Sequence, residues 1–116
     1  MQIINLLHFS DRAQLRVWLE ANHDSERECR VVTYIIKRPE WSAIRYVEVV
    51  EEALCFGWID STFKRLPDGR LTQRLSPRRA KSHWTDLNIQ RCYDLESRGL
   101  MTDAGRRVFE SLYYNI

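Results

Sequence analysis

A hairpin turn in the middle of the chain constrains the fold most. Pro67-Asp68-Gly69 separates two runs of alternating apolar and polar residues, Trp58 to Leu66 and Arg70 to Leu75. Proline and aspartate suit a type I turn, and the glycine suits the left-handed residue that closes a three-residue hairpin loop. The sequence therefore predicts two antiparallel strands joined at this turn.

The loop length also predicts which side chains share a face of the hairpin, because strand side chains alternate between the two faces. One face is expected to be mostly apolar: Ile59, Ser61, Phe63, Leu71, Gln73 and Leu75. The other is expected to be mostly polar: Trp58, Asp60, Thr62, Lys64, Thr72, Arg74 and Ser76.

A third strand and four helices follow from the remaining patterns. Cys29 to Lys37 is β-branched and apolar on both faces and precedes Pro39, which predicts a central strand covered on each side. Capping residues and apolar residues at helical spacing predict helices from Ser10-Asp11 to near Asn22, from Ser42 to Cys55 with Gly57 as its end, from Thr85 or Asp86 to Gly99, and from Thr102 onward. Trp18 is expected in the core.

These elements give a single α+β domain over residues 1–116, in the order αβαββαα, with a small antiparallel sheet packed by helices. The 116 residues, 44% hydrophobic and 29% charged, suffice for one core. Three widely spaced cysteines, Cys29, Cys55 and Cys92, predict reduced thiols, with no disulfide framework, metal site or cofactor. The start of the chain lacks a signal peptide and no run is long enough for a membrane span, so we expect a cytoplasmic protein without membrane insertion.

Charge is distributed unevenly, although the net charge is only +2. The segment Lys64 to Arg91 is basic, and "SPRRAKSHW", Ser76 to Trp84, combines cations with a tryptophan that could bind phosphate or nucleic acid. Alternatively, Arg78 and Arg79 reach back to Glu51, Glu52 or Asp60 in a structural role. The mild net charge makes nucleic-acid binding the less expected outcome.

Two residues invite a catalytic interpretation. Cys55 could be a nucleophile, but the C-terminal end of a helix disfavours a thiolate, so a buried, inert thiol is expected. Asp60 could act as an acid or base, and His8, His23 or His83 could approach it in the fold, yet a Ser/His/Asp triad has little support. We expect instead an ion pair between Asp60 and Arg74 or an arginine of the "SPRR" segment.

The segment Ala53 to Asn88 resembles the signature region of the YdeI/OmpD-associated family, also called bacteriocin-protection proteins. "ALCFGWIDS" (Ala53 to Ser61), Lys64, "QRLSPRR" (Gln73 to Arg79), Ser82, Trp84 and Asn88 carry the resemblance, with Leu71, Leu75 and Thr85 as departures. Longer members continue into a further helical segment, so the chain resembles their N-terminal signature domain. The resemblance implies a bacterial domain linked to protection against antimicrobial peptides and to a porin partner, without an established reaction.

The sequence thus predicts a cytosolic module that binds a small anionic ligand or a protein partner through the polar hairpin face. The expected ligand-binding residues are Trp58, Asp60, Lys64, Gln73, Arg74, Arg78, Arg79 and Trp84. Six of them are expected to line one shared concavity: Trp58, Asp60, Lys64, Arg74, Arg78 and Trp84. Two alternatives remain open: an enzyme of unknown reaction that uses Asp60, and a weak nucleic-acid binder. Catalytic residues and the oligomeric state are not predicted.

Overall fold

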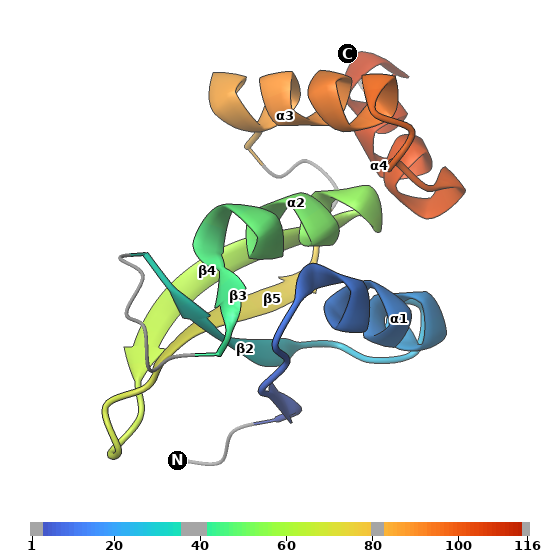
Figure 1. The fold of residues 1–116 in the computed structure, drawn as a ribbon. Helices are drawn as coiled ribbons and strands as arrows, with labels where there is room; N and C mark the ends of the chain where they lie inside the picture. The colour runs from blue at the N-terminus through green and yellow to red at the C-terminus, as the bar shows by residue number, and fades with distance from the viewer. Residues whose placement is uncertain (1–3, 36–41, 80–82, 115–116) are drawn as a thin grey trace.

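The computed structural model describes residues 4–35, 42–79 and 83–114, and within them it has an α+β fold (Figure 1). The predicted order αβαββαα is confirmed, with two additional strands of two residues each. The elements are β1 (Leu6–Leu7), α1 (Arg12–Asn22), β2 (Cys29–Tyr34), β3 (Ile44–Arg45), α2 (Tyr46–Cys55), β4 (Trp58–Arg65), β5 (Leu71–Pro77), α3 (Asp86–Ser97) and α4 (Asp103–Tyr114).

The sheet is mixed, whereas an antiparallel sheet was predicted. Its strand order is β1-β2-β5-β4, and β3 also pairs with β2. The β4–β5 hairpin and the β2–β5 pair are antiparallel, but the short strands β1 and β3 both run parallel to β2. β2 is interior, as the doubly apolar pattern predicted. It ends at Tyr34, and the predicted end at Lys37 lies outside the described residues.

A β-bulge in β4 overturns the predicted faces in the half of the hairpin next to α2, whereas Phe63–Gln73 and Lys64–Thr72 beside the turn pair as predicted. Asp60 pairs with Leu75 and Phe63 pairs with Gln73, so Ser61 and Thr62 together lie opposite Arg74. An extra residue in one strand reverses the side-chain alternation beyond it. Trp58 and Asp60 therefore share the helix-covered face with Gln73 and Leu75, while Arg74 points to the opposite face. The prediction that placed Asp60 and Arg74 on one polar face was wrong.

Helix α2 is the centre of the fold, lying between the sheet and α3 in Figure 1 and contacting α1, α3, α4, β2 and β4. Its residues Val49 to Cys55 are all buried, including two glutamates. The predicted helix start at Ser42 was wrong, because Ile44–Arg45 forms β3. There the hydroxyl of Thr33 donates to the carbonyl of Ile44 (2.7 Å), and Ile44–Arg45 pairs in parallel with β2. These two residues are therefore extended, and the helix begins only after them.

The buried glutamates of α2 hold three helices together. Glu52, only 1% exposed, binds Arg12 (2.5 Å) and Arg16 (3.1 Å) of α1. Glu51 binds Arg12 (2.9 Å) and also Arg98 (3.0 Å), which follows α3. The alternative in which Arg78 and Arg79 reach Glu51 or Glu52 is therefore wrong, since arginines from other helices occupy these carboxylates.

Close backbone contacts fix α4 against the end of α2. The Thr102 hydroxyl and backbone amide both donate to the carbonyl of Cys55. A Cβ atom at Gly105 would collide with that same carbonyl. Gly57 has a φ of +75°, as expected for a residue that ends a helix, and a Cβ there would lie 2.6 Å from Cγ2 of Val108. Two glycines thus let α4 approach the end of α2.

Candidate functional site

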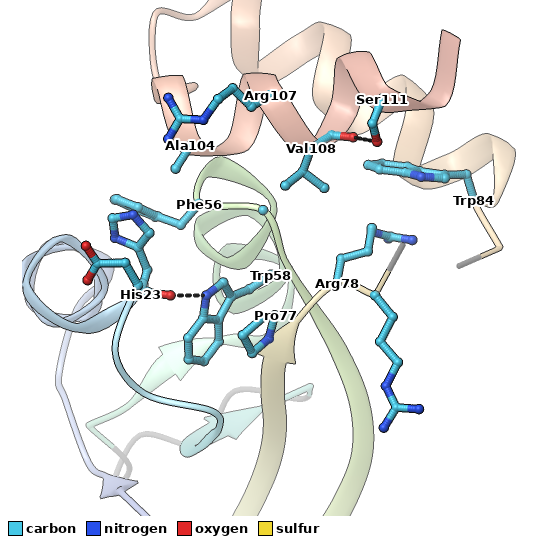
Figure 2. Close-up of a pocket in the computed structure, with 13 residues that line it drawn as sticks. His23, Phe56, Trp58, Pro77, Arg78, Trp84, Ala104, Arg107, Val108 and Ser111 are labelled. Atoms are coloured by element: carbon cyan, nitrogen blue, oxygen red, sulfur yellow. Dashed lines mark hydrogen bonds between the residues drawn. The ribbon is translucent and has the colours of Figure 1, made fainter. Parts of the chain in front are cut away.

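A cleft of about 470 Å³ opens where the start of β4, the end of β5, the end of α1 and helix α4 meet (Figure 2). This main cleft has a volume typical of small-molecule sites. Its described lining residues are His23, Asp24, Phe56, Gly57, Trp58, Pro77, Arg78, Arg79, Trp84, Ala104, Arg107, Val108 and Ser111.

The two walls of the main cleft come from distant parts of the chain. Figure 2 shows Val108 on α4 pointing toward the sheet side of the cleft, where Trp58 and Pro77 lie, while the side chain of Arg107 runs along the helix toward Ala104. The backbone amide of Arg78 donates to the carbonyl of Gly57 (3.0 Å), which joins the end of β5 to the turn before β4. The floor and the helical wall are therefore both parts of the packed core.

Arg78 is the most enclosed cation of the main cleft. Its guanidinium lies 3.8 Å from the centre of the Trp84 ring, and Nη1 donates to the carbonyl of His83 (3.1 Å). Only 9% of the residue is exposed. Burial lowers the pKa of Arg78, although the nearby Cys92 and Asp60 act in the opposite direction. Arginine remains charged at neutral pH even so, and a partly desolvated cation attracts anions more strongly than a fully hydrated one.

The lining of the main cleft is basic. Its described lining contains three arginines, Arg78, Arg79 and Arg107, and a single acid, Asp24. Guanidinium groups present several N–H donors in a planar fork that matches phosphate and carboxylate oxygens. Chemically, the arrangement can hold a small anion.

Four of the eight predicted ligand-binding residues meet in the main cleft: Trp58, Arg78, Arg79 and Trp84. Trp58 is 1% exposed, donates its indole N–H to the carbonyl of His23 (3.1 Å) and packs edge-on against Trp18. It therefore shapes the floor of the cleft and offers little surface for stacking. Trp18 is half-buried and packs against the core, close to the prediction.

The other four predicted ligand-binding residues lie elsewhere, and the prediction of one shared concavity was wrong for three of them: Asp60, Lys64 and Arg74. Arg74 donates to Glu28 (2.9 Å) on the opposite face of the sheet. Lys64 lies near the turn, opposite Thr72, and Gln73 is fully buried beneath the helices with both amide atoms lacking a hydrogen-bond partner among the described residues. Asp60 is half-buried and lines neither the main cleft nor the groove around Arg74.

The predicted ion pair of Asp60 is replaced by a hydrogen bond. Tyr46 of α2 donates its hydroxyl to Asp60 Oδ2 (3.1 Å). Burial raises the pKa of the Tyr46 hydroxyl, and the charge of Asp60 and this hydrogen bond raise it further, while Arg91 lowers it. Among the described residues no arginine or lysine lies within 4 Å of the Asp60 carboxylate. The prediction of an Asp60–Arg pair was wrong because the bulge turns Asp60 toward α2 and Arg74 away from it.

The three thiols are buried, as expected for inert cysteines. Burial raises the pKa of Cys55 to about 11, with Glu52 adding to the effect, and raises that of Cys92 to about 11. Burial together with Glu28 raises the pKa of Cys29 to about 12. None of the three is a thiolate at neutral pH. The part of the chain that the structure describes contains no group of three His, Cys, Asp or Glu residues able to hold a metal ion, and none of its helices could cross a membrane.

No direct sequence signal predicts the helical wall of the main cleft. Arg107 and His23 become neighbours of Arg78 only through the packing of α4 and α1 around α2. The one available clue was the pair of glycines, Gly57 and Gly105, since glycine within a helix often marks a close approach.

Comparison with known proteins gives a family and no activity. No curated protein and no solved structure is significantly similar to the chain. A family model described as a domain of unknown function (DUF8412) matches residues 7–108, which include every residue that we assign to the cleft except Ser111. The match covers most of the sequence, and the chain therefore belongs to the DUF8412 family.

Proposed function

We propose that the protein is a module that binds a small anionic ligand, carrying a phosphate or carboxylate group, in the main cleft. The observation that carries this proposal is that three arginines line one cleft, with the Arg78 guanidinium held 3.8 Å from the centre of the Trp84 ring. Side chains that are already ordered lose little conformational freedom on binding, so a fixed guanidinium favours affinity.

Arg107 and Arg79 complete the anion site in this proposal. Arg79 lies next to Arg78 in the chain, and Arg107 lines the opposite wall on α4. An anion between the two walls would accept hydrogen bonds from the guanidinium groups on each wall. These charged donors would replace the water molecules that hydrate the free anion.

Among the three functions predicted from the sequence, the geometry of the main cleft supports anion binding better than catalysis by Asp60 or nucleic-acid binding. An enzyme that uses Asp60 loses its geometric basis, because this carboxylate accepts a hydrogen bond from Tyr46 and lies outside the cleft lining. The resemblance to YdeI/OmpD-associated proteins, the role in antimicrobial-peptide protection and the cytoplasmic location remain predictions that accompany this proposal.

Isothermal titration with inorganic phosphate, citrate and a panel of phosphorylated metabolites tests the proposal. We expect Arg107→Ala to weaken binding of the best ligand at least about tenfold, which corresponds to about 1.4 kcal/mol. The matched control is Arg65→Ala, because Arg65 is exposed and, within the described part of the chain, its guanidinium donates only to the carbonyl of Gly69 in the hairpin turn. Asp60→Asn should leave the affinity unchanged if Asp60 has no part in the site.

Two results would contradict the proposal. The first is equal weakening by Arg107→Ala and Arg65→Ala, which would indicate a general charge effect rather than a site. The second is oligonucleotide binding whose affinity falls about a thousandfold between about 50 and about 200 mM salt, since that slope requires about six phosphate contacts and would indicate a nucleic-acid binder.

A further inference from the structure

A second basic groove lies on the other side of the end of β5. This outer groove, of about 540 Å³, is lined by Arg27, Glu28, Ile59, Arg74, Ser76, Pro77 and Arg79. Pro77 and Arg79 line the main cleft as well. The two hollows therefore meet at Pro77 and Arg79 and form one continuous basic surface, with Arg78 and Arg107 at one end and Arg27 and Arg74 at the other.

From this continuity we propose that the outer groove is a second anion subsite, and that the ligand class is an elongated molecule with an anionic group at each end. The inference rests on the proposed function of the main cleft and adds the shape and charge of its ligand. Arg79, exposed on the ridge between the hollows, would serve the middle of the ligand.

The surroundings of Arg74 show that this guanidinium already binds a carboxylate. Its Nε donates to Glu28 Oε2 at 2.9 Å, whereas Nη1 makes only long contacts of 3.4 Å to the hydroxyls of Ser61 and Ser76. Both partners of the ion pair keep about a third of their side chains exposed, 33% for Arg74 and 27% for Glu28. A partly exposed ion pair contributes little to stability, so an incoming anion can displace Glu28.

The β-bulge explains how Arg74 comes to serve this groove. Ser61 and Thr62 both lie opposite Arg74, and the Ser61 hydroxyl turns toward its guanidinium. Without the extra residue, Asp60 would lie on the same face as Arg74 and would neutralise it. The bulge thus separates this acid from the arginines of the outer groove.

Strand geometry limits the length of the ligand. Arg74 and Arg78 are four positions apart at the end of an extended strand, which separates their Cα atoms by about 13 Å. Two anionic groups on one ligand gain most when their spacing matches the distance between the two subsites, because the second group then binds at a high effective concentration. We expect a distinct optimum in ligand length.

Titration calorimetry with α,ω-alkane bisphosphonates of increasing length, each compared with the alkyl monophosphonate of equal length, tests the proposal. We expect the best bisphosphonate to bind at least about tenfold more tightly than its monophosphonate partner. Arg74→Ala should remove this advantage and leave monophosphonate binding unchanged. Glu28→Gln should increase the advantage, since it removes the competing carboxylate.

The matched control is Arg30→Ala. Arg30 pairs with Arg74 in the sheet, lies on the same face and donates to Thr62, but it lines neither hollow. Because directly paired side chains start only about 5 Å apart, this variant lowers the positive charge beside Arg74 without removing a donor from the groove, so it should weaken bisphosphonate binding less than Arg74→Ala does.

The outcomes separate the two proposals. If monophosphonates bind and depend on Arg107, but bisphosphonates gain nothing at any length, the second subsite is overturned and the proposed function stands. Equal effects of Arg74→Ala and Arg30→Ala on the bisphosphonate would also overturn it. If neither ligand class binds, both proposals are wrong.

Discussion

Trp84 lies between a cation and an aromatic ring of α4: the guanidinium of Arg78 lies 3.8 Å from its ring centre, and the ring of Phe109 contacts it edge-on with centroids 5.7 Å apart. One indole thus connects the end of β5 to the helical wall of the main cleft. The contact orders Arg78 and supports the wall at the same time, so a single substitution should disturb both stability and binding.

Trp84→Leu should lower the free energy of unfolding by about 2 kcal/mol, because it removes the cation–π contact and the aromatic packing together. Trp84→Phe should retain part of both. Urea denaturation followed by circular dichroism measures the difference. The control is Tyr93→Leu, since Tyr93 also packs edge-on against Phe109 (5.3 Å) and is half-exposed. If Tyr93→Leu destabilises the protein as much as Trp84→Leu, the Arg78 contact contributes little.

Glu52→Gln should destabilise the protein by about 3–5 kcal/mol, because it leaves Arg12 and Arg16 of α1 facing a neutral group in a largely buried network. Glu20→Gln is the matched control. Glu20 also faces Arg16, but at 3.7 Å and with 58% of its side chain exposed, so its loss should change the free energy of unfolding by less than about 1 kcal/mol. Guanidinium denaturation of both variants measures the two changes. A similar loss of stability in both would show that the specific ion pairs of Glu52 do not hold α1 against α2.

Stability should fall steeply between about pH 9 and pH 10. The thiols of the unfolded chain release their protons above about pH 9, whereas the native thiols keep theirs until about pH 11 or, for Cys29, about pH 12. The native state then binds more protons than the unfolded state, and each thiol lowers the free energy of unfolding by about 1.4 kcal/mol per pH unit.

Chemical denaturation at a series of alkaline pH values measures this slope. Cys92→Ala should reduce the slope of the free energy of unfolding against pH by the contribution of one thiol. This holds whether or not the substitution changes stability at neutral pH. An unchanged slope in the variant would show that groups other than this thiol control alkaline stability. The slope should be measured below about pH 10. Above that pH Tyr46 also lowers the free energy of unfolding, because burial and Asp60 raise its pKa in the native state.

Gly57→Ala should destabilise the protein more than Gly99→Ala. Both glycines have a positive φ, +75° and +72°, so alanine carries a similar backbone cost of about 1–2 kcal/mol at each. At Gly57 the new methyl group would also press on Val108, whereas the space beside Gly99 is open. Thermal unfolding of the single variants and of Gly57→Ala with Val108→Ala tests this: in the double variant the extra cost of Gly57→Ala should shrink, and an additive result would refute the contact.

Local chemistry predicted most of the fold, since its signals lie within a few residues. Asp11 caps α1 by accepting from the amide of Gln14 (3.1 Å), and Thr85 caps α3 by accepting from that of Asn88 (3.1 Å), both where the sequence placed a helix start. β1 and β3 escaped prediction because two residues carry no periodicity. Their strand character comes from parallel pairing with β2, which is a tertiary contact.

The candidate site was half predictable for a related reason. Trp58, Arg78, Arg79 and Trp84 were identified because they are concentrated around the hairpin and the segment that follows it. The bulge at Ser61 and Thr62 was not visible in the pattern, and it changed the face of every residue between it and α2. A turn fixes strand register only as far as the first irregularity. Asp60 and Arg74 were therefore assigned to a common surface that does not exist.

The close seating of α4 on α2 has a kinetic consequence. Since Gly105 and Thr102 hold α4 against the carbonyl of Cys55, the helical wall of the main cleft belongs to the core and is no lid. A ligand then meets a preformed surface, and no opening step precedes binding. Association rates should follow long-range attraction to the arginines and slow as ionic strength rises, while dissociation rates distinguish one anion from another.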